Sequence, residues 1–173
     1  MPKKIAKSTV HLGDAVRARR MDLDLTQQAL ADMTGFSRGH IATIERTSGN
    51  LRLSSLDRLA RALNLDVVDL VRSTSEKQRK VSAQEAVVRA ACHIFQLRKA
   101  LGLSQERLSE AAGFFRTYVT EIELLISVPA IGSLESIAAV LEVSVADLLM
   151  PVAKSEYDAR LARKSARARM DEE

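Results

Sequence analysis

The chain has 173 residues, of which 46% are hydrophobic and 28% are charged, as in ordinary globular proteins. Its single cysteine, Cys92, excludes an intramolecular disulfide and disfavours a cysteine-built zinc site, and the 3% aromatic content without tryptophan disfavours ligand cages and stacking platforms for single strands. No apolar run approaches the roughly 20 residues of a membrane helix, and the polar N-terminus is unlike a signal peptide, so we expect a cytoplasmic protein without membrane contact.

The chain contains one sequence pattern twice, at a constant offset of 78 positions and without a gap between residues 12–71 and 90–149. The first copy contains Leu25-Thr26-Gln27, Gly35-Phe36-Ser37-Arg38 and Ile44-Glu45; the second contains Leu103-Ser104-Gln105, Gly113-Phe114-Phe115-Arg116 and Ile122-Glu123. Each copy has enough apolar positions for its own core, which predicts two small domains. We therefore divide the chain into a basic arm (1–11), a first domain (12–72), a linker (73–81), a second, degenerate domain (82–150) and a tail (151–173).

Apolar periodicity and capping residues predict five helices in the first copy. The first runs from Leu12 toward Met21, and the second follows a cap at Thr26, with Ala29, Leu30 and Met33 on its apolar face. The third runs from a cap at Ser37 to about Arg46. The fourth runs from about Ser54 through Leu63, and the fifth from a cap at Asp66 to Leu70. We expect Gly35 to supply the tight turn before the third helix, where a positive φ favours glycine.

The second copy predicts the same helices, so the expected fold class is all-α. Ser82 and Glu85 fit a capping box that opens a long helix toward Leu97. After the repeat, a helix from about Glu156 would place four basic residues along one side: Arg160, Arg163, Lys164 and Arg167. We expect a solvated helix or a frayed tail there, with contact to DNA backbone or to a dimer partner as alternatives.

Two short helices joined by a turn that carries glycine form a helix-turn-helix motif. With Leu-Thr/Ser-Gln, Gly-Phe-x-Arg and Ile-Glu at matching spacing, and a Leu-x-x-Leu/Ile-Ala-x-x-Leu helix downstream, both copies resemble the DNA-binding domain of the Cro and phage-repressor (XRE) family. The resemblance covers residues 12–71 and 90–149. It implies two tandem five-helix lambda-repressor-like domains and double-stranded DNA as the partner.

The resemblance also implies where the first copy meets DNA. In that family the third helix lies in the major groove, and the base-facing positions here are Arg38, Gly39, Ala42 and Thr43. Arg38 can donate two hydrogen bonds to guanine, Thr43 could meet a thymine methyl or an adenine edge, and Gly39 would let the backbone approach the groove. Backbone contacts would come from Gln27, Arg46 and Arg52 and from Lys3 and Lys4 in the arm.

A buried ion pair between the first and third helices of each copy is a further implication of the resemblance. The pair is Arg20 with Glu45 in the first copy and Arg98 with Glu123 in the second. We expect both pairs to be structural, because removal of one partner leaves the other charge buried and unpaired.

The second copy keeps this scaffold but loses the DNA-facing residues. Phe115, Glu121 and Leu124 stand where the first copy has Ser37, Thr43 and Arg46, and residues 90–149 carry a net charge of −3 from four basic and seven acidic side chains. The loop after the third helix is apolar, and an exposed apolar patch marks an interaction surface. We therefore expect an interface for a second copy of the chain, or for another protein, formed by Phe115, Tyr118, Leu124, Leu125, Ile126, Val128 and Ile131. The alternative is that this loop folds back onto its own core through Pro129 and Ile131.

These features predict a sequence-specific transcriptional regulator, a repressor by analogy, that binds an inverted-repeat operator as a homodimer: the first copy reads the groove and the second mediates dimerisation. One alternative is a monomer whose two copies both bind DNA as a pseudo-dimer. Another is an antitoxin or regulator antagonist that binds a protein partner through the second copy. We expect no enzyme, metal or cofactor, since His11, His40 and His93 have no metal-ligand spacing and neither a phosphate-binding glycine loop nor a nucleophile motif is present.

Overall fold

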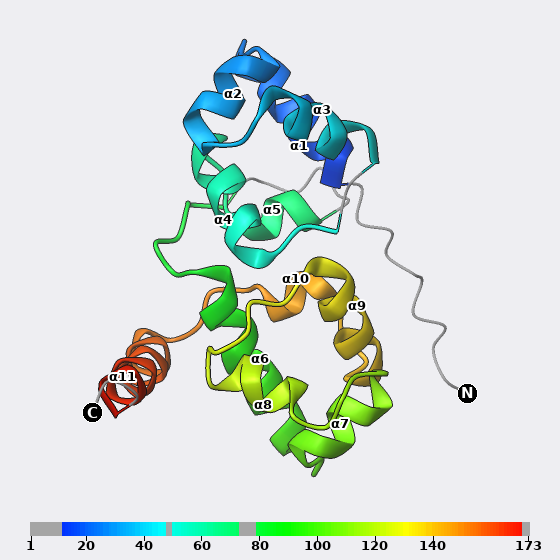
Figure 1. Cartoon of the computed structure of the whole chain (residues 1–173), viewed down its shortest axis with the longest axis vertical. Helices are drawn as coiled ribbons and strands as arrows, with labels where there is room; N and C mark the ends of the chain where they lie inside the picture. Colours follow the sequence, from blue (N-terminus) through cyan, green and yellow to red (C-terminus); the bar gives the residue numbers. More distant parts are fainter. Residues whose placement is uncertain (1–11, 48–49, 73–78, 171–173) are drawn as a thin grey trace. The chain divides into compact units, whose positions relative to one another are not determined.

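The computed structural model describes residues 12–47, 50–72 and 79–170, with side chains up to residue 166, and every regular element in these ranges is a helix (Figure 1). The described residues fall into two compact units that divide between Ala83 and Gln84. Each unit contains one copy of the repeat. The expected all-α fold with two tandem helical domains is therefore confirmed.

The first domain consists of α1 (Leu12–Asp22), α2 (Gln27–Thr34), α3 (Arg38–Thr47), α4 (Leu53–Ala62) and α5 (Val67–Val71). These helices begin and end within one residue of the positions expected from the sequence. Two of the expected caps are formed: the Thr26 hydroxyl accepts a hydrogen bond from the Ala29 amide, and the Asp66 carboxylate accepts one from the Val68 amide, each at 3.0 Å. Such caps satisfy amides that have no partner inside the helix.

The second domain consists of α6 (Ala86–Ala100), α7 (Gln105–Ala111), α8 (Tyr118–Glu123), α9 (Ile131–Val140) and α10 (Val145–Leu148), and α11 (Lys154–Met170) follows it. The capping box expected at Ser82 and Glu85 is wrong. Glu85 precedes α6 without a side-chain cap. The Ser82 amide donates instead to Asp66 Oδ2 in the first domain, at 3.2 Å, while the other carboxylate oxygen of Asp66 accepts from Val68.

Both domains are built on the same core positions. In the first, Leu12, Val16, Leu30, Ile41 and Ile44 are at most 1% exposed, and their counterparts 78 residues later, Ala90, Ile94, Leu108, Val119 and Ile122, are fully buried. The third helix of each copy is thus held by equivalent apolar side chains. Its opposite face is left for other contacts.

The buried face of α2 differs from the expected one by a small rotation. Met33, expected on the inner side, is 56% exposed, whereas Leu30, Ala31 and Thr34 are buried. Thr34 is tolerated there because its hydroxyl donates back to the Leu30 carbonyl at 2.7 Å, so no polar group is left without a partner.

Helices α1 and α3 approach so closely that only glycine fits at one position. A Cβ atom built on Gly13 would lie 2.5 Å from the carbonyl oxygen of Ile44 and 2.9 Å from that of Glu45. The end of the third helix therefore rests directly on the backbone of α1. This contact fixes the distance between the two helices.

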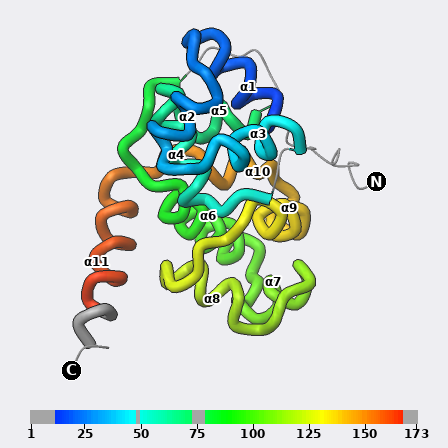
Figure 2. Tube along the Cα trace, turned by 45° about the horizontal axis from the view of Figure 1, so that its top comes forward, coloured from blue at the N-terminus to red at the C-terminus, as the bar shows by residue number. Residues whose placement is uncertain are grey.

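Helix α11 runs along one side of the second domain, next to α6 (Figure 2). Among the described residues, no helix is both long enough and apolar enough to cross a membrane.

Candidate nucleic-acid interface

The turn that presents α3 is held at both of its ends. Gly35 ends α2 in the left-handed conformation, with φ of +67°, and its amide donates to the Ala31 carbonyl. Ser37 then caps α3, since its hydroxyl accepts from the His40 amide at 3.1 Å. Gly35 and Ser37 thus take the places that the sequence predicted.

Helix α4 supports this turn from outside the motif. Arg58 donates from Nε to the Thr34 carbonyl at 2.8 Å, donates from Nη2 to the same oxygen, and lies over the Phe36 ring at 4.3 Å from the ring centre. Sequence reasoning missed Arg58, because nothing in its spacing distinguishes it from a solvated arginine. The second domain has Ser136 at this position, whose hydroxyl bonds within its own helix to Gly132.

Three of the four expected base-contact residues project from α3 into solvent. Arg38, Gly39 and Thr43 are exposed, whereas Ala42 is half-buried. A Cβ atom added to Gly39 would meet nothing within 4 Å, so the backbone is open at this point. The outward face of α3 therefore presents the exposed guanidinium of Arg38, the open backbone at Gly39 and the small polar side chain of Thr43.

Two of the expected backbone-contact residues, Gln27 and Arg46, line a pocket beside α3. The pocket is lined by Asp14, Arg17, Arg20, Gln27, Ala42, Glu45 and Arg46. Arg46 is exposed, and so is Arg52, which immediately precedes α4. Arg17 was not expected from the sequence, but it adds positive charge to the pocket. Lys3 and Lys4, the expected contacts from the arm, lie outside the described residues.

The structure brings the expected ion pair of the first domain together at the base of this pocket. Arg20 donates from Nε to Glu45 Oε1 at 2.6 Å, from Nη2 to Oε2 at 3.1 Å, and from Nη1 to the Leu25 carbonyl at 2.6 Å. Burial raises the pKa of Glu45, but hydrogen bonds from Arg20 and Gln27 and the nearby Arg20 charge outweigh burial and hold that pKa below its ordinary value. The pair is therefore ionised and joins α1 to the end of α3.

Gln27 extends this network toward solvent. Its amide nitrogen donates to Glu45 Oε2 at 3.0 Å, which orients the side chain. An amide nitrogen carries two hydrogens, so one remains for an acceptor outside the protein. The arrangement matches a residue that donates to a phosphate oxygen.

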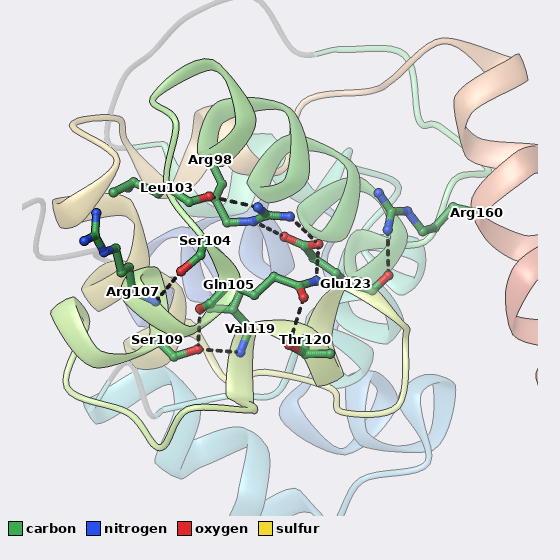
Figure 3. A network of polar contacts seen from close by, with 10 residues as sticks. All are labelled: Arg98, Leu103, Ser104, Gln105, Arg107, Ser109, Val119, Thr120, Glu123 and Arg160. Carbon is green, nitrogen blue, oxygen red and sulfur yellow. Dashed lines mark hydrogen bonds and ion pairs between the residues drawn. The ribbon is translucent and has the colours of Figure 1, made fainter.

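The second domain contains the same network (Figure 3). Arg98 donates to the two carboxylate oxygens of Glu123 at 2.8 and 3.0 Å, and the Gln105 amide nitrogen donates to the same carboxylate at 2.7 Å. Two hydroxyls strengthen it: Thr120 donates to the Gln105 side-chain oxygen at 3.2 Å, and Ser109 accepts from the Val119 amide at 3.0 Å. The first domain has alanine at both hydroxyl positions, so the second motif is bonded more extensively within itself.

The third helix begins later in the second domain than in the first. Helix α3 begins at Arg38, but α8 begins at Tyr118, two positions later in the repeat. The reason is visible in the sequence: Phe115 replaces the capping Ser37 and has no oxygen to accept from the helix amides. Arg116 and Thr117 consequently precede the helix.

Arg116, the counterpart of Arg38, is bound by carboxylates of its own domain. Its Nη2 atom lies 2.7 Å from Glu106 and its Nε atom 3.4 Å from Glu110. The hydrogen bond to Glu106 raises the pKa of Arg116 above its ordinary value. These pairs are exposed, with the Arg116 side chain 68% accessible, and a contact to guanine would have to replace them.

The expected apolar interface is only partly exposed. Phe115 is 58% exposed, Ile126 50% and Leu124 38%, and Tyr118 and Val128 are half-buried. The prediction is wrong for Leu125 and Ile131, which are 7% and 5% exposed. Leu125 adopts a left-handed conformation with φ of +59°, which accompanies the burial of its side chain, and Ile131 begins α9 within the core. The loop thus folds back in part, as in the alternative.

Among the residues that stay exposed, Phe115 belongs to a small aromatic cluster at the start of α8, whereas Leu124 and Ile126 follow the end of that helix. The Tyr118 ring lies 4.4 Å from the Phe114 ring and 5.4 Å from the Phe115 ring, measured between centres. At these positions the first domain has His40, Phe36 and Ser37. We refer below to Phe115, Tyr118, Leu124 and Ile126 as the aromatic patch.

The expectation of a solvated or frayed tail is wrong for the first turns of α11. Arg160 is only 9% exposed, donates to the Glu123 carbonyl at 2.7 Å and lies over the Phe95 ring at 5.0 Å. The Tyr157 hydroxyl accepts from the Glu85 amide at 2.9 Å. Arg160 also reaches the pocket that corresponds to the one in the first domain, where Phe95 and Leu124 replace Arg17 and Arg46. A protein helix therefore contacts this side of the second motif.

The described residues contain no group of three or more His, Cys, Asp or Glu side chains that could hold a metal ion.

Comparison with known proteins identifies both copies of the repeat. The sequence pattern of the family described as "Helix-turn-helix" matches residues 16–70 and 94–148, more than half of the chain. Control protein C.SmaI of Serratia marcescens is 40% identical over 60 residues, which cover 35% of this chain and 71% of that protein. The HTH-type transcriptional regulators SinR of Bacillus licheniformis and Bacillus subtilis are each 42% identical over 69 residues, which cover 39% of this chain and 62% of SinR. No solved structure gives a significant match.

Proposed function

This chain belongs to the helix-turn-helix family of DNA-binding transcriptional regulators, and we propose that it is a repressor that binds an inverted-repeat operator as a homodimer. As a member of this family it is a regulator and not an enzyme. In the proposal, α3 of the first domain reads the major groove, and the second domain joins two copies of the chain. The two first domains would then meet half-sites about one helical turn apart.

The observation that carries the proposal is the contrast between Arg38 and Arg116. Arg38 begins a capped helix and is exposed, so its guanidinium can donate to the O6 and N7 atoms of a guanine. Arg116 precedes its helix and is bound to Glu106 and Glu110. In the proposal, the first domain presents this arginine for base contact, whereas the equivalent arginine of the second domain, although its side chain is 68% exposed, is paired with carboxylates of its own domain.

The remaining first-domain contacts would position the protein on DNA without specifying sequence. Gln27 and Arg46, which line the pocket beside α3, and the exposed Arg52 would donate to phosphate oxygens. Lys3 and Lys4 enter the proposal as further phosphate contacts from the arm. Removal of the arm would then reduce the dependence of affinity on salt concentration.

Dimerisation through the second domain is supported by its aromatic patch. Phe115, Leu124 and Ile126 are large apolar side chains that stay exposed on the domain whose third helix begins late, and exposed apolar side chains favour protein contact. Tyr118, which contacts Phe115, and Val128 are half-buried. Binding of a different protein, as by an antitoxin or an antagonist of another regulator, would use the same surface.

The test is a gel-shift titration on the duplex that the full-length protein selects from random DNA. Arg38→Ala should weaken binding about 10- to 100-fold, the loss expected for a bidentate contact to guanine. Arg116→Ala should change affinity less than about 2-fold, and it is the matched control because both arginines occupy the same position of the repeat. Circular dichroism checks that both variants are folded.

Two outcomes would contradict the proposal. If Arg116→Ala is as damaging as Arg38→Ala, both domains read DNA and a monomeric pseudo-dimer replaces the division of labour. If the protein selects no common sequence, it is not a sequence-specific operator-binding protein, and a role in binding another protein becomes the better reading.

A further inference from the structure

The hydroxyl of Thr43 has its hydrogen-bonding role set by the helix that carries it. Thr43 is exposed on α3, and its Oγ1 atom donates to the Gly39 carbonyl at 2.9 Å, one turn earlier. A hydroxyl has one proton to donate and two lone pairs that accept. While the proton is bonded to Gly39, the oxygen presents its lone pairs outward and accepts a hydrogen bond from outside.

Gly39 leaves the space beside this hydroxyl free. Side chains on a helix lean toward its N-terminus, so Thr43 lies over the turn that contains Gly39. A Cβ atom on Gly39 would meet nothing within 4 Å, and the glycine has none. A base edge can therefore come close to the Thr43 hydroxyl and methyl without meeting a side chain at the preceding turn.

We propose that Thr43 specifies an A·T base pair, with Oγ1 accepting a hydrogen bond from the N6 amino group of adenine and the methyl group contacting the thymine methyl. The inference rests on the proposed function, since it needs α3 in the major groove. The sequence left two alternatives for Thr43, a contact with a thymine methyl or with an adenine edge. In the proposal, Thr43 makes both contacts with the same A·T base pair.

The choice of A·T follows from the atoms that each base pair presents in the major groove. Adenine offers the N6 donor and thymine a methyl group, whereas guanine offers only acceptors, O6 and N7. An acceptor-only hydroxyl is repelled by these guanine atoms and by adenine N7. Cytosine N4 is a donor, but cytosine lacks the methyl, so a G·C pair satisfies only one of the two contacts.

Arg38 has the opposite polarity. Its guanidinium can only donate, so it suits the guanine acceptors that Thr43 rejects. Two exposed residues of α3 thus discriminate in opposite directions. The selected half-site should contain a G·C pair that Arg38→Ala no longer prefers. It should also contain a nearby A·T pair that Thr43→Ala no longer prefers.

The experiment uses base analogues at that A·T pair in the duplex selected by the full-length protein. 2-Aminopurine removes the N6 amino group from the major groove, deoxyuridine removes the thymine methyl, and 7-deazaadenine removes N7. The first two should each weaken wild-type binding about 3- to 10-fold, the range of one net hydrogen bond or one buried methyl. The third should change affinity less than about 2-fold, because a hydroxyl without a free proton cannot donate to N7.

Two variants of similar volume separate the halves of the contact. Thr43→Val keeps a methyl and lacks the hydroxyl, so it should remain sensitive to deoxyuridine and lose its sensitivity to 2-aminopurine. Thr43→Ser keeps the hydroxyl and lacks the methyl, so the pattern should reverse. Because the side chain is exposed, neither change disturbs the core, and thermal unfolding verifies this.

Failure of the inference looks different from failure of the proposed function. If a site is selected but Thr43→Ala changes the preference at a G·C pair, or 7-deazaadenine weakens binding as much as 2-aminopurine, Thr43 does not act as described. If no site is selected at all, the proposed function fails and the inference fails with it.

Discussion

Two glycines of the first domain lie in opposite steric surroundings, which makes them a matched pair for substitution. Gly13→Ala would force a Cβ atom against the carbonyl oxygens of Ile44 and Glu45. We expect it to lower the free energy of unfolding by about 1–3 kcal/mol, the usual cost of overpacking, although alanine favours helix. Urea denaturation of the full chain measures the change.

Gly39→Ala should have the opposite effect on stability, because open space surrounds the added methyl. Alanine is about 1 kcal/mol more favourable than glycine within a helix, so the first domain should become more stable while DNA affinity falls. Stabilisation by Gly13→Ala would show that α1 and α3 can move apart. Unchanged DNA affinity in Gly39→Ala would show that no base pair approaches this part of α3.

The buried carboxylate of Glu45 predicts how the first domain responds to acid. Its pKa in the folded state lies below the ordinary value of roughly 4.3, so its ion pair stabilises the fold above that pH and is lost as pH falls through the folded pKa. Wild type should exceed Glu45→Gln in free energy of unfolding near neutral pH. The difference should shrink steadily below about pH 4.3. A difference that stays constant through acid pH would contradict this assignment.

At the scale of a secondary-structure element, α11 acts as a sixth helix of the second domain. Arg160→Ala removes a buried donor to the Glu123 carbonyl and the contact with the Phe95 ring. We expect a loss of about 1.5–3 kcal/mol in the free energy of unfolding, as for a hydrogen bond from a charged group. Arg163→Ala, an exposed position on the same helix, should cost less than about 0.5 kcal/mol.

Equal effects of the two substitutions in urea denaturation would show that α11 is held by its general charge and not by the buried Arg160. The same experiment on a chain ending at Ala153 should show a loss at least as large as that of Arg160→Ala, since it removes all of α11, including Tyr157.

At the scale of the whole molecule, the aromatic patch should decide the oligomeric state. Ile126→Asp places a charge on a side chain that is 50% exposed, so it should leave the fold intact and convert a dimer to a monomer in sedimentation velocity. Met33→Asp is the control, because Met33 is 56% exposed but belongs to the first domain. A wild-type chain that sediments as a monomer at micromolar concentration would favour the pseudo-dimer.

Helix positions and ion pairs could be predicted from the sequence because their determinants are local or repeated. Thr26 and Asp66 lie next to the amides they cap, and the pairs Arg20 with Glu45 and Arg98 with Glu123 recur at the same offset. The late start of α8 was also predictable in principle, since Phe115 cannot cap a helix.

Other features depend on contacts between residues distant in the sequence, which no local pattern specifies. Arg160 resembles a solvated arginine until Phe95 and the Glu123 carbonyl are seen beside it. Leu125 reads as part of an apolar loop, and only a left-handed backbone, uncommon for leucine, accompanies its burial. Tertiary packing decided both cases against the local preference.

Helix α11 packs over Cys92, the one cysteine of the chain. Cys92 is 3% exposed and shares a pocket with Phe95, Glu156 and Arg160. Burial raises the pKa of this thiol, so little of the reactive thiolate forms while the helix is in place. The rate at which a thiol reagent modifies Cys92 in the unaltered protein would therefore measure how often α11 opens, and a ligand of the second domain that holds α11 closed would be detected as slower labelling.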